Sequence, residues 1–205
     1  MTTNNQEIES KFYLRNPAAI EARLLALGAT CRVPRGFEYN LRYADPEGNL
    51  LRERKVLRLR KFDDVRLTFK GPGQAINGAL SRAEIELIVD NFENAQLFLA
   101  GLGYQVVMIY EKYRAIYELE GALITLDELP YGQFVEIEAK TPEEIARLAN
   151  KLGLNPKAAI PASYQGLFER LKQTRGLSMP HLTFEAFKGL EISPDELGVR
   201  PSDGG

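Results

Sequence analysis

The chain has 205 residues, of which 44% are hydrophobic and 26% charged, and its net charge is −2. This composition is typical of a soluble globular domain, and the near-neutral charge argues against nucleic-acid or membrane partners. No apolar run reaches the roughly 18 residues of a membrane span. One cysteine and one histidine exclude an internal disulfide and a zinc site of thiolates and imidazoles. Because the first ten residues carry no secretory signal, we expect a cytoplasmic protein.

Alternating side chains and capping residues predict the secondary structure along the chain. A first strand spans residues 6–14, and Asn16 with Pro17 then begins a helix that Gly28 ends. The later elements, in chain order, are strands at 36–43, 55–62 and 65–70, a glycine-rich loop at 71–80, a strand at 82–90, a helix at 92–101, one long strand or two over 104–118, strands at 122–127 and 133–140, a helix from the capping box at 141–144 to Gly153, and a helix at 163–173.

About eight strands, most of them consecutive, with three or four helices between them, predict an antiparallel α+β fold. We expect residues 1–174 to form one domain. The pattern weakens beyond it, so we expect residues 175–205 to be a C-terminal appendage, with short helices and a frayed end. Three helices end in Leu-Gly. This leaves open whether the domain has two related halves or only repeats a common helix terminus.

Charged residues recur two positions apart in most of the predicted strands, and mostly apolar residues lie between them. Because strand side chains alternate between the two faces of a sheet, the charged residues share one face. The segments are Glu7/Glu9/Lys11, Arg58/Arg60, Arg66/Lys70 (with Thr68 between), Glu84/Glu86, Lys112/Arg114 and Glu136/Glu138. Two interpretations stay open on this pattern alone. The sheet is either open with a solvated charged face, or an eight-stranded closed barrel around a charged tunnel with the helices outside.

A tunnel would bring seven carboxylates together. Two like charges about 4 Å apart repel by roughly 4 kcal/mol at an effective dielectric near 20, so these groups need cations among them. Carboxylate oxygens suit Mg²⁺ or Mn²⁺, although ordinary surface salt bridges would explain any single pair. The carboxylates are Glu7, Glu9, Glu84, Glu86, Asp127, Glu136 and Glu138.

Basic residues occupy the matching strand faces. Arginine forks and lysine point charges both bind phosphate oxygens, so the pattern favours a small molecule that contains a triphosphate. The basic residues are Lys11, Arg58, Arg60, Arg66, Lys70, Arg82, Lys112 and Arg114. Arg82 is the weakest of these candidates, since it also suits a salt bridge to its neighbours.

Two other features do not indicate a site. Residues 70–73 lack the spacing and the following helix of a P-loop, so we interpret them as a hairpin connection. A Ser–His or Cys–His pair would need His181, which lies in the tail and is better explained as a surface or packing residue.

In their order along residues 6–172, the charged motifs resemble those of CYTH proteins, in the triphosphate tunnel metalloenzyme superfamily. The hallmark Glu-x-Glu-x-Lys is matched at residues 7–11. The later matches are Arg-x-Arg at 58–60, Lys70, Glu-x-Glu at 84–86, Lys-x-Arg at 112–114, Asp127 and Glu-x-Glu at 136–138. Residues 129–138 and 163–164 resemble the branch of class IV adenylyl cyclases and thiamine-triphosphatase-like proteins. The resemblance implies the closed eight-stranded tunnel.

The resemblance also implies a division of labour among the charged residues. Phosphate oxygens would be bound by Lys11, Arg58, Arg60, Lys70, Lys112 and Arg114, to which the strand pattern adds Arg66. Mg²⁺ or Mn²⁺ would be held by Glu7, Glu9, Asp127, Glu136 and Glu138. Glu84 and Glu86 would hold a second metal ion or orient the attacking group, so the expected catalytic residues are Lys11, Glu84 and Glu86.

One segment departs from the family pattern. Cyclase-type members tend to carry Asp-x-Tyr-Phe on the second strand, where this chain has Asn40-Leu41-Arg42-Tyr43. The loss of that Asp and Tyr disfavours cyclisation of a nucleotide. Tyr39 or Tyr43 would have to face Lys11 to help activate water, and a place in the core or at the rim is the simpler expectation.

We therefore expect a metal-dependent triphosphatase that cleaves inorganic triphosphate or a small organic triphosphate, with water as the nucleophile. The first alternative is a class IV adenylyl cyclase that makes cyclic AMP and pyrophosphate from ATP. The second is a non-catalytic module that binds polyphosphate or nucleotides. The sequence leaves a homodimer open.

Overall fold

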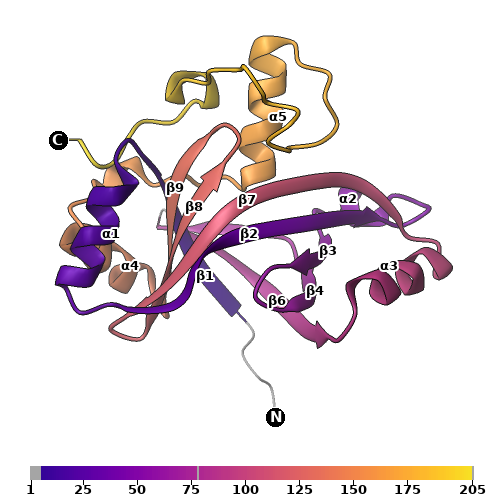
Figure 1. Cartoon of the computed structure of the whole chain (residues 1–205), viewed down its shortest axis with the longest axis horizontal. Helices are drawn as coiled ribbons and strands as arrows, with labels where there is room; N and C mark the ends of the chain where they lie inside the picture. The colour runs from indigo at the N-terminus through magenta and orange to yellow at the C-terminus, as the bar shows by residue number, and fades with distance from the viewer. Residues whose placement is uncertain (1–5, 78, 205) are drawn as a thin grey trace.

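The computed structural model describes residues 6–77 and 79–204, with side chains from residue 8 onward in these ranges. Within them, antiparallel strands form one sheet in the order β1-β9-β8-β7-β2-β3-β4-β6-β5, and β1 also pairs with β6, so the sheet closes into a ring (Figure 1). The strands are β1 (Gln6–Leu14), β2 (Thr30–Ala44), β3 (Val56–Lys61), β4 (Val65–Lys70), β5 (Gln74–Ile76), β6 (Ala79–Val89), β7 (Gln105–Leu119), β8 (Ala122–Leu129) and β9 (Gly132–Glu138).

A short strand pairing and several β-bulges allow the sheet to close into a ring. The β1–β6 pairing runs only from Gln6 opposite Ala83 to Glu9 opposite Leu80. The long β2–β7 pair has three register shifts, the last between Arg42 and Tyr43. A β-bulge bends its strand and increases the local twist, which a ring of strands requires. The tunnel interpretation is therefore confirmed, and the open sheet is excluded.

The helices lie outside the ring, and polar side chains cap their first turns. The Asn16 side chain accepts a hydrogen bond from the Ala19 amide at 3.1 Å, and Thr141 accepts one from the Glu144 amide at 3.2 Å. Such caps satisfy amides that the helix itself leaves free. The helices are α1 (Pro17–Ala26), α2 (Asn49–Arg52), α3 (Phe92–Gly101), α4 (Pro142–Lys151) and α5 (Tyr164–Arg175), with 3-10 turns η1 (Pro156–Ala158) and η2 (Pro194–Leu197).

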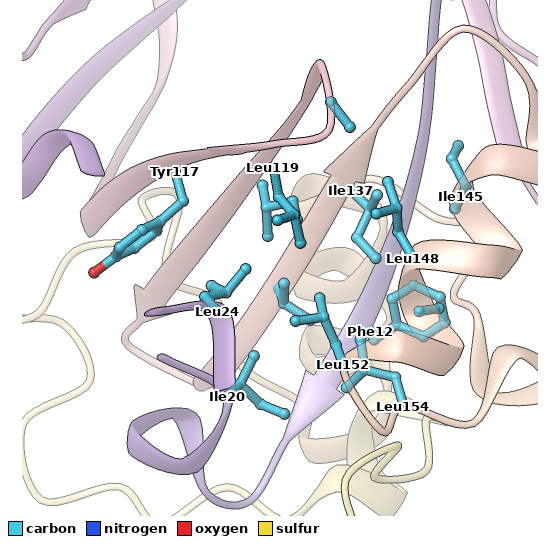
Figure 2. Packing of buried hydrophobic residues seen from close by; sticks show 14 of the residues in the cluster. Phe12, Ile20, Leu24, Tyr117, Leu119, Ile137, Ile145, Leu148, Leu152 and Leu154 are labelled. Atoms are coloured by element: carbon cyan, nitrogen blue, oxygen red, sulfur yellow. The ribbon is translucent and has the colours of Figure 1, made fainter. Parts of the chain in front are cut away.

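Helices cover the apolar faces of most strands, whereas on β6 the outward side chains of Ile85 and Leu87 are 51% and 57% exposed. Figure 2 shows Leu24 of α1 and Leu148 of α4 packed near Ile137 of β9 and Leu119 of β7, and all four side chains are at most 4% exposed. A second cluster joins α3 to β2 and β3. Burying a large aliphatic side chain stabilises a fold by about 1.5–3 kcal/mol, so these clusters hold the ring from outside and leave its interior to charges.

The C-terminal residues cover one end of the ring together with α5. Leu182 is fully buried, and its amide and carbonyl bond to Ile109 and Glu111 of β7, both at 2.9 Å. Near the end of the chain, the Ser202 amide donates to the Tyr13 carbonyl at 3.0 Å. Ser202 thus pairs with β1 close to the C-terminus, in the segment where the sequence pattern predicts a frayed end.

Most predicted elements are confirmed, with a few differences. The predicted loop at 71–80 contains β5, and α2 was not expected. Residues 104–118 form one strand, and the second strand begins earlier than expected, at Thr30. Tyr39 and Tyr43 pack in the cluster under α3, so they lie in the core. None of the helices in the described ranges combines the length and the apolar content needed to cross a membrane.

Candidate active site

The ring encloses a cavity of about 940 Å³ that is dominated by charged side chains. Among the described residues, eleven basic and six acidic side chains line it, so its interior favours a polyanion. The basic residues are Lys11, Arg42, Arg54, Lys55, Arg58, Arg60, Arg66, Lys70, Arg82, Lys112 and Arg114. The acidic residues are Glu9, Asp63, Glu84, Glu86, Glu136 and Glu138.

Nearly all the residues predicted for the site meet in this cavity. Two of the set need separate mention. The Glu7 side chain lies outside the described part of the structure, although its backbone pairs with Arg82 in the β1–β6 ladder. Asp127 is 2% exposed and does not line the cavity, because it lies behind the basic residues of β7.

Lys11 of β1 and Glu136 of β9 lie opposite each other and form an ion pair inside the cavity. Burial alone would lower the pKa of Lys11, but Glu136, Glu9 and Asp127 together raise it. Burial would likewise raise the pKa of Glu136, yet Lys11 and Arg114 hold it well below its usual range. Lys11 is therefore an ammonium that can bind and neutralise phosphate oxygens, and not a base.

Asp127 fixes the orientation of the neighbouring cations. Arg114 grips it through Nε and Nη2 at 2.6 and 2.5 Å, and Lys112 Nζ lies 3.1 Å from Oδ2. The Tyr164 hydroxyl of α5 donates to the same oxygen at 2.7 Å. Since both carboxylate oxygens accept hydrogen bonds in this arrangement, metal binding by Asp127 stays a prediction that requires one of these donors to move.

Glu38 of β2 is a buried carboxylate that the sequence reasoning missed. It is 0% exposed and accepts a hydrogen bond from Asn40 Nδ2 at 3.0 Å. Lys112 Nζ lies 3.4 Å away and Arg114 Nε 3.8 Å away. Burial opposes its ionisation, but Lys112, Arg114, Arg58 and Arg60 lower its pKa to about 2. The signal was present in the sequence, because Glu38 alternates with Asn40 and Arg42.

Arginines on β3 and β4 form the opposite side of the cavity. Arg58 donates to the Tyr110 hydroxyl and to Thr68 Oγ1, both at 3.2 Å. Glu86 of β6 accepts from Arg66 at 2.7 Å and from Thr68 at 3.0 Å. Burial would raise the pKa of Glu86, but these hydrogen bonds and the charges of Arg58 and Arg66 lower it. Glu86 is thus an anion held in a fixed position.

Tyr164, at the start of α5, closes the cavity from one end. Its ring lies 4.2 Å from Lys11 Nζ and 5.1 Å from Lys112 Nζ, and its hydroxyl is bound to Asp127. A cation over an aromatic face is stabilised by the ring's quadrupole. The sequence marked Tyr164 only through the family resemblance, because its position depends on how α5 folds back over the ring.

The chemistry of the acidic residues fits a hard divalent cation. Glu9 and Glu138 lie opposite each other in the β1–β9 ladder, both line the cavity, and no thiolate or imidazole lines it among the described residues. Oxygen ligands of this kind suit Mg²⁺ or Mn²⁺, which commonly also bind substrate phosphates. The described residues contain no ready group of three or more metal-ligating side chains, so a metal ion would complete its ligand set with substrate and water.

Comparison with known proteins gives consistent results. The sequence model of the CYTH domain matches residues 5–164. A solved structure of a candidate adenylate cyclase from Vibrio parahaemolyticus is 23% identical, with a TM-score of 0.69, and the match covers 80% of this chain and 97% of that one. The protein PH1819 from Pyrococcus horikoshii is 27% identical, with a TM-score of 0.64 and coverage of 80% and 98%.

A third solved structure is that of HpAC1 from Hippeastrum, a candidate adenylyl cyclase with a dominant triphosphatase activity. It is 20% identical to this chain, with a TM-score of 0.59 and coverage of 85% and 98%. No curated protein sequence matches the chain.

Proposed function

The chain belongs to the CYTH domain family, and from this premise we propose that it is a divalent-metal-dependent hydrolase that cleaves a phosphoanhydride bond of a triphosphate. The observation that carries the proposal is the composition of the enclosed cavity. Eleven basic side chains outnumber the six carboxylates among the described residues that line it, which suits a small ligand with several negative charges. Phosphoryl transfer depends mainly on positioning and electrostatic stabilisation, and a fixed lattice of charges supplies both.

The basic residues of the proposed site bind the phosphate chain. Lys11, held by Glu136, and Arg114, held by Asp127, are fixed before substrate enters, so little reorganisation is needed when charge develops on phosphate oxygens. Lys112, Arg58, Arg60, Arg66 and Lys70 extend this cationic lining along the cavity. Because Lys11 stays protonated, its proposed catalytic role is to stabilise charge on the transferred phosphoryl group or on the leaving phosphate.

The carboxylates divide between metal binding and orientation of water. We assign the divalent cation, Mg²⁺ or Mn²⁺, to Glu9 and Glu138, with Glu7, Asp127 and Glu136 as the further predicted ligands. Like Asp127, Glu136 must release a donor to bind the ion, because Lys11 and Arg114 contact its two oxygens. When bound, the ion neutralises charge on the phosphate oxygens. On the opposite side, Glu84 lies 2.8 Å from Lys70 and Glu86 is held by Arg66 and Thr68. We propose that these two carboxylates orient the attacking water by accepting hydrogen bonds from it, or hold a second metal ion.

Hydrolysis is favoured over cyclisation by the tunnel face of β2. Cyclisation requires a nucleoside whose ribose hydroxyl attacks the α-phosphate. At the position where cyclase-type proteins tend to have a Tyr, this chain has Arg42, and Arg42 lines the cavity. Product analysis with ATP separates the three hypotheses. Cyclic AMP supports the cyclase, and phosphate released from ATP or from inorganic triphosphate supports the hydrolase. Binding without any product from either substrate over hours supports the non-catalytic module.

The direct test is phosphate release from inorganic triphosphate with Mn²⁺, using Lys11→Ala and Glu136→Ala. We expect both substitutions to abolish release, because each removes one member of the central ion pair. Lys188→Ala is the matched control, since Lys188 is 79% exposed and pairs only loosely with Glu185. Release that is indifferent to both tunnel substitutions would refute the mechanism.

The cellular context is also part of the proposal. Cys31 is a free, exposed thiol, which suits a reducing compartment, so we propose a cytoplasmic location. A homodimer stays a prediction that light scattering of the purified protein would test.

A further inference from the structure

Arg42 holds an unusual place among the cavity's basic residues. It lies on the tunnel face of β2, alternating with Asn40 and Glu38, and its register partners are Arg58 on β3 and Met108 on β7. Its side chain lines the cavity near the end where β2 finishes and β3 begins. Arg42 is thus placed to touch whatever occupies that end of the tunnel.

Arg42 has no hydrogen-bonding or ion-pair partner among the residues that the structure describes. The arginines that line the cavity from neighbouring strands each have an acceptor, which is Tyr110 for Arg58, Asp64 for Arg60, Glu86 for Arg66, Glu9 for Arg82 and Asp127 for Arg114. A half-buried guanidinium without an acceptor is unfavourable, because its lost hydration is not replaced.

The surroundings of Arg42 make this arrangement still less favourable without a ligand. Burial lowers the pKa of Arg42, Tyr110 opposes that effect, and the charges of Arg58 and Arg82 lower the pKa further. An arginine nevertheless stays charged in proteins. Arg54 and Lys55, which directly precede β3, also line the cavity. This end of the tunnel therefore concentrates positive charge that an anion would relieve.

The cavity as a whole offers few aromatic side chains to an organic group. Among the described residues, the aromatic side chains that line the cavity are Tyr110 and Tyr164. The Tyr110 hydroxyl already accepts from Arg58, and the Tyr164 ring lies under Lys11. Both tyrosines are thus already in contact with basic residues, and the guanidinium fork of Arg42 matches phosphate oxygens.

We propose that Arg42 binds a terminal phosphate and thereby makes this tunnel select inorganic triphosphate and longer inorganic polyphosphates over nucleoside triphosphates. This inference rests on the proposed function and narrows its substrate class. An inorganic chain ends in a phosphate on both sides, so it can satisfy Arg42 and the cations around Lys11 together. A nucleoside triphosphate presents a sugar and base at one of these ends.

The test compares Arg42→Met and Arg42→Lys with the wild-type protein on inorganic triphosphate and on ATP, with the same metal ion. A hydrogen bond to a charged group contributes about 1.5–3 kcal/mol, so Arg42→Met should lower kcat/KM for triphosphate roughly 10- to 100-fold, mainly through KM. For ATP the change should be less than about threefold. Arg42→Lys keeps the charge and should recover most of the loss.

Calorimetric binding of triphosphate to the metal-free protein gives a second readout that does not need turnover. Arg42→Met should weaken this binding, and Arg32→Met should not, because Arg32 lies on the same strand with its side chain 55% exposed and paired with Glu118. Equal losses for triphosphate and ATP, or unchanged triphosphate binding in a folded Arg42→Met protein, would overturn the proposal. If the wild-type protein hydrolyses neither substrate, the proposed function fails, while the calorimetric comparison still decides the role of Arg42.

Discussion

The two sides of the tunnel differ in how completely their buried charged side chains are paired. On the side of β1, β7, β8 and β9, which we call the paired wall, Lys11 and Arg114 each contact buried carboxylates, and Asp127 accepts four hydrogen bonds. On the side of β2, β3, β4 and β6, which we call the arginine wall, Arg42 has no partner among the described residues, and the Nε atoms of Arg58 and Arg60 are buried without one.

This difference indicates different roles. Removing one member of a buried pair leaves an uncompensated charge, so the stability of the fold is sensitive to the loss of any one partner in the paired wall. Charges that lack full pairing in the folded protein are instead available to a ligand. The side chains of the paired wall are therefore preorganised, and the arginine wall provides hydrogen-bond donors that are still available to a ligand. Four predictions test this comparison, from the largest expected effect to the smallest.

Asp127→Ala should have the largest effect on stability. The substitution leaves Arg114 and Lys112 without their main buried partner, and breaking a buried pair in this way costs about 3–5 kcal/mol. Denaturant unfolding monitored by circular dichroism measures the loss. Asp63→Ala is the matched control, because Asp63 is 32% exposed and lies 3.4 Å from Arg60, so its loss should cost under about 1 kcal/mol. Equal effects would remove the distinction between the two walls.

Glu38 should make the stability of the protein depend on acid pH. Its pKa is lowered from 4.5 to about 2 in the folded state, so its contribution is complete above pH 4.5 and is lost as the pH falls towards 2. The linked free energy is about 3 kcal/mol. The free energy of unfolding, measured at several pH values between 6 and 2, should therefore fall more steeply with decreasing pH for the wild-type protein than for Glu38→Gln. Identical pH dependences would mean that Glu38 is not held as a buried anion.

Arg58→Met should affect ligand binding more than folding. Its hydrogen-bond partners, Tyr110 and Thr68, are neutral side chains. Glu86 lies 3.6 Å from Arg58 but keeps its closer partner Arg66 when Arg58 is replaced. We expect a roughly 10- to 100-fold weaker affinity for triphosphate by calorimetry, with a melting temperature within a few degrees of the wild type. A large loss of stability with unchanged affinity would reverse the assignment of the arginine wall.

Added salt should have the smallest effect of the four changes, and it should weaken triphosphate binding more than it changes protein stability. The Debye length falls from about 10 Å at 0.1 M to about 3 Å at 1 M ionic strength, and buried pairs are screened less than charges exposed to solvent. Affinity for triphosphate should fall several-fold across this range, while the melting temperature changes little. Calorimetry measures the affinity, and differential scanning fluorimetry measures the melting temperature of the same protein. A larger effect of salt on the melting temperature than on the affinity would contradict this prediction.

Local patterns predicted most of the ring. The predicted end of the first strand at residue 14 agrees with β1, because the alternation over residues 7–11 marks its face and the Asn16 cap marks its end. The three residues of β5 have no period to detect, and they lie in a glycine-rich segment. The early part of β2 was missed because Pro34 and Gly36 interrupt it, whereas the structure accommodates them with register shifts against β7.

The candidate site was predictable where charge recurs on one strand, and not where a role depends on distant partners. Alternation identified Lys11 and Glu136, and the ladder places them opposite each other. Glu38 is a single acid on its strand, and its importance arises from Lys112 and Arg114, more than 70 residues away. The buried position of Asp127 behind Arg114 is likewise a product of packing that spacing alone does not encode.

The most direct measurement of the central claim is phosphate release from inorganic triphosphate as Mn²⁺ or Mg²⁺ is added to chelator-treated protein. We expect no release without metal and a saturable rise with either ion or with one of them. We also expect loss of that rise in Glu136→Gln, a variant that keeps the side-chain shape. Release that is independent of metal, or undiminished in this folded variant, would contradict a site built from tunnel carboxylates and cations acting on one substrate.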